Sequence, residues 1–245
     1  MPRQARTLGE SGYMHLIVRG IRKQIMFEEA ADYRKFLALL ERFCKETEVK
    51  PCAYCLMDNH VHLLVCDPNG NTPLLMKKLG VSYALYFNRK YDRSGHLLQD
   101  RYLSETVDSD AYLLMVFRYI LNNPGKAGIC DARNYPWNSY AQYDLPEPWM
   151  ELSLVRSLLG GLSEYEAFID AANDDQCLEY DKPRHDDAWA LNVIRKCLDV
   201  ESGTALQGYP REERNEALRT LKANGLTVRQ IERLTGINRN IVQKV

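Results

Sequence analysis

The chain has 245 residues, enough to bury a hydrophobic core and to form one or two domains. Its composition, 45% hydrophobic and 27% charged, is typical of a soluble globular protein. No apolar run approaches the roughly 18 to 20 residues of a membrane-spanning helix, and the first residues lack the apolar core of a signal peptide. Seven cysteines, an odd number, do not indicate a disulfide framework. These features predict a cytoplasmic protein with no membrane partner.

The net charge of −1 conceals an uneven distribution along the chain. Residues 1–150 carry 19 basic and 17 acidic side chains, and residues 201–245 carry 8 and 5. The acidic excess lies in residues 151–200, with 11 acidic and 5 basic side chains. A neutral total therefore does not exclude binding to nucleic acid.

The predicted elements of the first 145 residues alternate between strands and helices. Apolar residues recur at the three/four spacing of a buried helix face in three segments, and shorter apolar runs between them are strand-like. In chain order they are a strand at 12–20, a helix at 28–47, a hairpin of two strands joined at Asp58 and Asn59, a helix at 71–91, a strand at 95–107 and a helix at 108–128. This order predicts an α+β domain, an antiparallel sheet covered by helices on one face, that ends near residue 145.

The remaining chain is predicted to be helical and to divide in two. Residues 146–208 form an acidic linker region with helical pieces, and residues 209–245 resemble a helix-turn-helix. In the latter, a helix is expected at about 211–223, Thr227 begins a short second helix, and Gly236 is the turn before a third. The buried positions of the motif are taken by Ile231, Ile237, Val242 and Val245.

Arg229, Asn238, Arg239 and Asn240 would be exposed on this motif, where they could contact DNA. One residue departs from the pattern, because Glu232 stands where the motif usually has a small side chain. The alternative is a helical hairpin with no role in DNA binding.

Two histidines, His60 and His62, lie in the stretch "DNHVHLLV". Residues i and i+2 of a strand project from the same face, so the two imidazoles could bind one divalent metal. They could equally be hydrogen-bonded core residues or coincidence. Downstream, Tyr119 and Asn123 are spaced i, i+4 and share one face of a helix. Spacing alone leaves Tyr119 as an ordinary packing residue.

Several other polar residues can be interpreted either as functional or as ordinary structural and surface residues. Gln99 and Arg101 could touch DNA or lie on an edge strand. A small basic group, Arg19, Arg22 and Lys23, follows the first strand and is more often a solvated surface than a phosphate clamp. Structural or surface roles are expected for His15 and His96. Finally, Cys52 and Cys55 are expected on opposite faces of a strand, which argues against a zinc or redox pair.

Four motifs occur together in one order: "DNHVHLLV", "GHLLQDRY", "FRYILNNPGKAGI" and "YPWNSY". In the presence and order of these four motifs, residues 10–145 resemble the single-tyrosine transposases of the HUH type. The resemblance is strongest to the REP-associated tyrosine transposases and their insertion-sequence relatives. The resemblance implies a ferredoxin-like or RRM-like sheet, with His60, His62 and Asn123 as metal ligands and Tyr119 as the nucleophile.

The resemblance also implies an activity and partners. The expected reaction is transesterification of single-stranded or hairpin DNA through a 5′-phosphotyrosine, with Mg²⁺ or Mn²⁺ as the cofactor. The protein would be bacterial and nucleoid-associated, and could form a homodimer. The alternative is a domesticated, non-catalytic DNA-binding regulator of palindromic repeats. A metal-dependent hydrolase of the barrel type is set aside, because only His185 lies beyond residue 96 to supply further histidine ligands.

Overall fold

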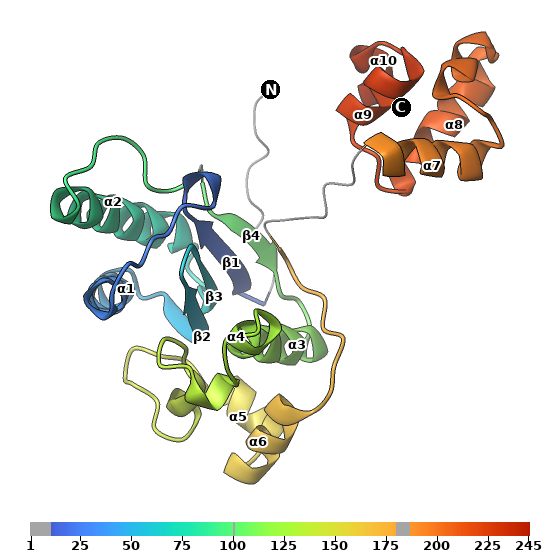
Figure 1. Ribbon diagram of the computed structural model, residues 1–245. Helices are drawn as coiled ribbons and strands as arrows, with labels where there is room; N and C mark the ends of the chain where they lie inside the picture. The colour runs from blue at the N-terminus through green and yellow to red at the C-terminus, as the bar shows by residue number, and fades with distance from the viewer. Residues whose placement is uncertain (1–10, 100, 180–186) are drawn as a thin grey trace. The chain divides into compact units, whose positions relative to one another are not determined.

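The computed structural model describes residues 11–99, 101–179 and 187–245 of the chain (Figure 1). The chain divides into two compact units, residues 1–180 and 181–245. Each unit has its own hydrophobic core, so each is considered by itself.

The first unit is built on a four-stranded antiparallel sheet with strand order β2-β3-β1-β4. The order of strands and helices agrees with the sequence prediction, and the fold class is confirmed as α+β. Along the chain its main elements are β1 (Tyr13–Arg19), α1 (Ala30–Thr47), β2 (Lys50–Met57), β3 (His60–Cys66), α2 (Thr72–Lys90), β4 (Leu103–Thr106) and α3 (Asp110–Leu121).

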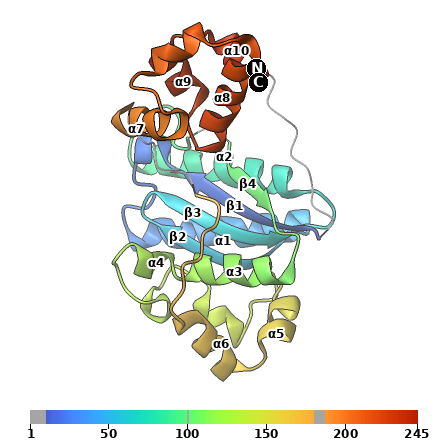
Figure 2. The same cartoon turned by 90° about the vertical axis from the view of Figure 1, so that its right-hand side faces the viewer.

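Helices cover both faces of this sheet, whereas the sequence pattern predicted one covered face (Figures 1 and 2). The helices α1 and α2 pack on the face that carries Leu16, Leu56 and Leu63. The helix α3 packs on the opposite face, against Cys55 and Leu64. Every residue from Val61 to Val65 is buried, so β3 is covered on both faces. Strands of this kind have nearly continuous apolar sequences instead of alternating apolar and polar residues.

The strand expected at 95–107 is shorter than predicted. Of its described residues, 95–99 and 101–107, only those of β4 form a regular ladder with β1, while Leu98 makes an isolated bridge with Gly20. Ile21 N donates to Leu97 O at 2.8 Å, so residues near 98 stay beside the end of β1. The exposed side chain of Arg101 lies between this bridge and β4.

Further helices pack behind α3. They are α4 (Asn123–Lys126), α5 (Ser153–Leu159) and α6 (Leu162–Asp170), with 3-10 turns η1 (Ile21–Lys23), η2 (Ala132–Asn134) and η3 (Tyr140–Tyr143) elsewhere in the unit. Val155 and Tyr165 are buried in the same core as Phe117 of α3. Residues 146–179 therefore extend the first core, so the structure places a boundary near 180 rather than at 145 and 208.

The second unit is a small all-helical core. It contains α7 (Asp187–Leu198), η4 (Gly203–Gly208), α8 (Arg211–Ala223), α9 (Val228–Thr235) and α10 (Arg239–Lys244). The bounds of α8 agree with the predicted helix, and Ile231, Ile237 and Val242 are buried as expected. Within the described part of the chain, no helix is both long and apolar enough to cross a membrane.

Local contacts explain why α9 and α10 form where they do. Thr227 accepts a hydrogen bond from Gln230 N and caps α9, and Gly236 takes the left-handed conformation (φ 71°) that ends it. Glu232, which departs from the usual motif, accepts from Arg239 N at 3.1 Å. Its carboxylate thus satisfies a backbone donor at the start of α10.

Candidate functional site

His60 and His62 lie at the start of β3, on the sheet face that α3 covers. Their ring centroids are 5.0 Å apart, with the ring planes at 77°. The antiparallel register pairs His62 with Ile17 and His60 with Arg19 of β1. His62 is only 3% exposed, while His60 is partly exposed at the end of the strand.

Each of these histidines contacts a neighbour through its Nδ1 atom. His62 Nδ1 lies 3.1 Å from His15 Nε2, and His60 Nδ1 lies 2.7 Å from Asn59 Oδ1. Such contacts fix the ring orientation and direct Nε2 of each imidazole to other ligands. Burial, together with the neighbouring His15, His60 and Lys126, lowers the pKa of His62 well below its ordinary value, so this ring is neutral at pH 7.

Tyr119 reaches this face from α3. Ser109 caps that helix by accepting from Tyr112 N, and residues of the α3 face toward the sheet are buried. The ring of Tyr119 is 5.7 Å from that of His62 and 6.1 Å from that of His15, centroid to centroid. The structure therefore brings the predicted nucleophile next to the histidine pair.

Asn123 follows one helical turn after Tyr119, at the start of α4. Its Nδ2 donates to Tyr119 O at 2.9 Å, which leaves the carboxamide oxygen Oδ1 as its ligand atom. Two imidazole nitrogens and one amide oxygen suit a divalent cation whose other positions are filled by water and phosphate. This donor set fits a divalent metal, although the described residues contain no cluster of three or more His, Cys, Asp or Glu side chains placed to hold one.

The segment 171–179, which follows α6, lies over Tyr119. Tyr119 Oη donates to Glu179 Oε1 at 2.8 Å, and Lys126 Nζ lies 4.0 Å from the centroid of the tyrosine ring. The segment is anchored by a bidentate ion pair in which Arg118 Nε and Nη2 each lie 2.7 Å from the Asp175 carboxylate. Burial and then the Glu179 carboxylate raise the pKa of Tyr119 well above its ordinary value, so the phenol is neutral.

Four of the predicted DNA-contacting residues gather near the His60 end of the sheet. Arg19 is 8% exposed and lies opposite His60 in the β1–β3 register. Its carbonyl accepts a hydrogen bond from Gln99 N at 2.8 Å. Arg22 is exposed in the turn after β1, where it and Lys23 take left-handed backbone conformations (φ 52° and 65°). Arg101 is exposed two residues before β4. Non-glycine residues in left-handed backbone conformations are strained, and such residues cluster at active sites and ligand-binding sites.

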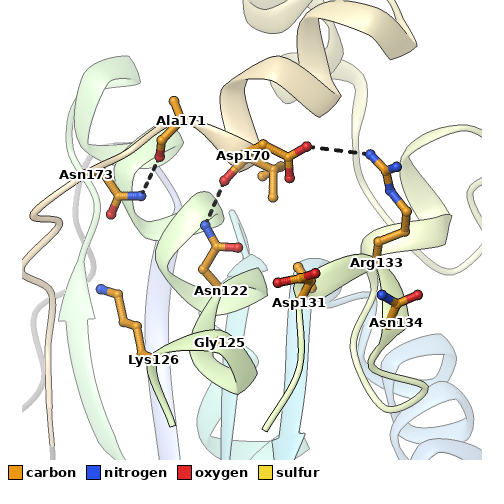
Figure 3. A pocket seen from close by; sticks show the side chains of 11 residues that line it. Asn122, Gly125, Lys126, Asp131, Arg133, Asn134, Asp170, Ala171 and Asn173 are labelled. Atoms are coloured by element: carbon orange, nitrogen blue, oxygen red, sulfur yellow. Dashed lines mark hydrogen bonds and ion pairs between the residues drawn. The ribbon is translucent and has the colours of Figure 1, made fainter. Parts of the chain in front are cut away.

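A polar pocket of about 610 Å³ lies next to α4 (Figure 3). Lys126 and Arg133 line it together with Asp131 and Asp170, so its charges balance. Arg133 pairs with Asp170 at 3.6 Å across the pocket. Neither His60 nor His62 lines this pocket, and its charge balance does not favour a phosphate.

In the second unit, the predicted DNA-contacting residues Arg229, Arg239 and Asn240 are exposed. Asn238 is also exposed, but its Oδ1 accepts from Asn240 N at 2.9 Å and caps α10. Asn238 thus has a structural role as a helix cap, and Arg229, Asn238 and Arg239 all remain predictions as DNA contacts.

Three residues of the site were not predicted from the sequence. His15 was expected to have a structural or a surface role, and the structure places it fully buried against His62. A signal was present, because residues 15, 17 and 19 of a strand share one face. Glu179 and Lys126 gave no comparable signal, since their approach to Tyr119 depends on tertiary packing.

The chain is similar to known transposases. Residues 10–123 match the family model described as IS200-like transposase. The solved structure of a REP-associated tyrosine transposase bound to a REP hairpin aligns with a TM-score of 0.55 and 14% identity, over 76% of this chain and 100% of its own. A protein described as a transposase from Deinococcus radiodurans aligns over 49% of this chain and 96% of its own, with 23% identity and a TM-score of 0.34. No curated protein gives a significant match. At 14% identity, the likeness to the REP-associated transposase shows the fold alone.

Proposed function

We infer, from the match of residues 10–123 to the IS200-like transposase family model, that this part of the chain is a member of that family and that the chain is a metal-dependent single-stranded DNA transesterase. We propose that it cuts and rejoins DNA through a 5′-phosphotyrosine on Tyr119. Hairpin or palindromic DNA is the proposed substrate class, because the structurally similar REP-associated transposase was solved with a REP hairpin.

The observation that carries this proposal is the convergence of Tyr119 with the two histidines. A strand supplies His60 and His62, and a helix from a distant part of the sequence places the Tyr119 ring 5.7 Å from His62. The side chain of Asn123 is held close to Tyr119, because Asn123 Nδ2 donates a hydrogen bond to Tyr119 O. A tyrosine that served only packing would not require the buried, neutral imidazole of His62 beside it.

The proposed chemistry is a displacement at phosphorus. His60, His62 and Asn123 would hold a divalent ion, Mg²⁺ or Mn²⁺, which when bound supplies Lewis-acid activation of the scissile phosphate. Tyr119 loses its phenolic proton, and Oη forms a bond to phosphorus while the bond to the 3′-oxygen breaks. The 3′-oxygen takes up a proton and leaves as a free hydroxyl. A later 3′-hydroxyl reverses the exchange and rejoins the strands without ATP.

The basic residues near His60 are proposed to hold the DNA backbone. Arg19 and Arg22 can neutralise phosphates next to the scissile bond, with Gln99 and Arg101 on the adjoining segment. In the second unit, Arg229 and Arg239 are exposed on a helix-turn-helix and could contact a duplex stem.

The test is a covalent adduct that survives denaturation. Purified protein is mixed with hairpin-bearing single-stranded DNA and Mn²⁺ or Mg²⁺, then separated on a denaturing gel. We expect an adduct with the natural chain, none with Tyr119→Phe, and a strong reduction with His62→Ala. Tyr112→Phe is the matched control, because Tyr112 lies on the same helix and donates to Glu105 instead of Glu179.

The experiment also separates the proposal from its alternative, a non-catalytic regulator of palindromic repeats. One feature favours the alternative. The segment 171–179 covers Tyr119, and this residue is only 3% exposed. Hairpin DNA that binds tightly but gives no adduct with either metal supports the regulator. An adduct that persists in Tyr119→Phe contradicts the assignment of the nucleophile.

A further inference from the structure

We propose that His15 is a positioning residue for the metal-binding site, which orients His62 and selects its metal-competent tautomer. The inference rests on the proposed function, because it assumes that His62 ligates a metal. It assigns a role to a side chain that is fully buried on β1 and contacts no proposed substrate group.

The contact between the two rings is direct and specific. His15 Nε2 lies 3.1 Å from His62 Nδ1, and the rings stack with centroids 5.3 Å apart and planes at 29°. His15 comes from β1 and His62 from β3, which are paired strands of the same sheet. A hydrogen bond between rigid strand residues fixes the angle of the His62 ring.

The proton between the rings decides whether His62 can bind a metal. If His62 Nδ1–H donates to His15 Nε2, the lone pair of His62 Nε2 is available to a cation. If instead His15 Nε2–H donates to His62 Nδ1, the proton of neutral His62 stands on Nε2 and blocks ligation. The metal-competent arrangement therefore requires His15 to act as the hydrogen-bond acceptor.

The second nitrogen of His15 argues against a purely structural role for this residue. His15 Nδ1 is buried and has no hydrogen-bond partner. Glu105, the residue paired with His15 on β4, instead accepts from Tyr112 Oη at 2.5 Å. A buried imidazole with an unpaired nitrogen is costlier than an apolar side chain of similar size. A purely structural position would favour leucine or phenylalanine.

His60 has a corresponding neighbour. Asn59 Oδ1 lies 2.7 Å from His60 Nδ1, and Asn59 Nδ2 donates to Lys23 O at 3.3 Å. An amide oxygen can only accept, so this contact by itself places the proton of His60 on Nδ1. His15 lacks such a fixed polarity, which makes the His15–His62 contact the one whose direction depends on the metal.

The test measures metal affinity on the full-length protein. Mn²⁺ binding is followed by titration calorimetry and by the electron paramagnetic resonance signal of the free ion, for the natural chain, His15→Leu and His15→Gln. Loss of an outer-shell partner typically weakens metal binding by about 10- to 100-fold, so we expect this loss in His15→Leu. His15→Gln keeps an acceptor oxygen and should recover most of the affinity.

Two measurements distinguish positioning from a structural role. The ¹H–¹⁵N spectrum of His62, assigned with His62→Ala, should show a proton on Nδ1 when Mg²⁺ is bound to the natural chain and to His15→Gln. Thermal unfolding should show that His15→Leu is at least as stable as the natural chain. His96→Leu is the matched control, since His96 is exposed and should change neither affinity nor spectrum.

The outcomes separate this inference from the proposed function. Mn²⁺ binding that needs His62 but is unchanged in His15→Leu overturns the role of His15 and leaves the metal site intact. Absence of Mn²⁺ binding to the natural chain overturns the metal site and the inference together. A loss in His15→Leu that His15→Gln does not restore contradicts the acceptor role.

Discussion

The contact between Tyr119 and Glu179 predicts that a neutral side chain at position 179 makes the tyrosine a better nucleophile. In the natural chain, Tyr119 Oη lies 2.8 Å from the Glu179 carboxylate. Glu179→Gln keeps the shape of the side chain and an oxygen that can accept this hydrogen bond. The substitution removes only the negative charge. Because that charge raises the pKa of Tyr119, its removal lowers this pKa and increases the phenolate fraction at any given pH.

The same charge opposes the approach of the substrate. An attacking oxygen must come within about 3 to 3.5 Å of phosphorus, which places the phosphodiester roughly 5 Å from the Glu179 carboxylate. Glu179 is exposed, so solvent screening is strong, and an effective dielectric of about 40 to 80 gives a repulsion of about 1 to 2 kcal/mol. We therefore expect adduct formation to accelerate by roughly 5- to 30-fold.

The assay is the single-turnover rate of adduct formation, measured from neutral to mildly alkaline pH. The natural chain, Glu179→Gln and the control Glu164→Gln are compared with saturating DNA and metal. Glu164 is an exposed carboxylate in the first turn of α6, and no contact joins it to Tyr119. The rate of Glu179→Gln should be higher than that of the natural chain at every pH in this range.

An equal or slower rate for Glu179→Gln across this pH range would refute the reasoning. Such a result would mean that the carboxylate helps to remove the phenolic proton, or that the segment 171–179 leaves Tyr119 when DNA binds. An acceleration shared by Glu164→Gln would show a general effect of surface charge instead.

Three further predictions concern stability and DNA binding. Burial lowers the pKa of His15 from 6.5 to about 3, so below pH 6.5 the unfolded chain binds a proton that the fold excludes. The free energy of unfolding therefore decreases as pH falls. In urea unfolding at pH 5, protonation of His15 in the unfolded chain should account for about 2 kcal/mol of this decrease, and His15→Gln should not show that part of it. Leu218→Ala, at a fully buried position of the second unit, should lower the stability of residues 187–245 by about 2 to 5 kcal/mol in hydrogen exchange, whereas the exposed-face change Arg219→Ala should stay within about 0.5 kcal/mol. Arg22→Ala should weaken binding to hairpin DNA and reduce the slope of log affinity against log salt by about 1, whereas Arg42→Ala on α1 should leave that slope unchanged.

Local patterns predicted the elements well because their causes lie within a few residues. The helix at 211–223, the cap at Thr227 and the turn at Gly236 are each determined by neighbouring side chains or by backbone conformation. The hairpin at Asp58 and Asn59 likewise follows from turn chemistry. The pairing of His60 and His62 on one face follows from the two-residue period of a strand.

Other features could not be predicted because they depend on tertiary packing. Cys52 and Cys55 were expected on opposite faces, but a register shift between Pro51 and Ala53 places both in the core beneath α3. The cover over Tyr119 depends on the ion pair between Arg118 and Asp175, which are 57 residues apart. No period in the sequence reports such a contact.

The covalent attachment point tests the central claim most directly. Trypsin releases residues 119–126, "YILNNPGK", as a peptide with a single tyrosine, although the chain has 15. Protein reacted with hairpin DNA and Mn²⁺ is digested with trypsin and nuclease, and the nucleotide-bearing peptide is sequenced by mass spectrometry. A nucleotide linked through a 5′-phosphate to Tyr119 is the predicted result, and attachment to any other residue contradicts the account.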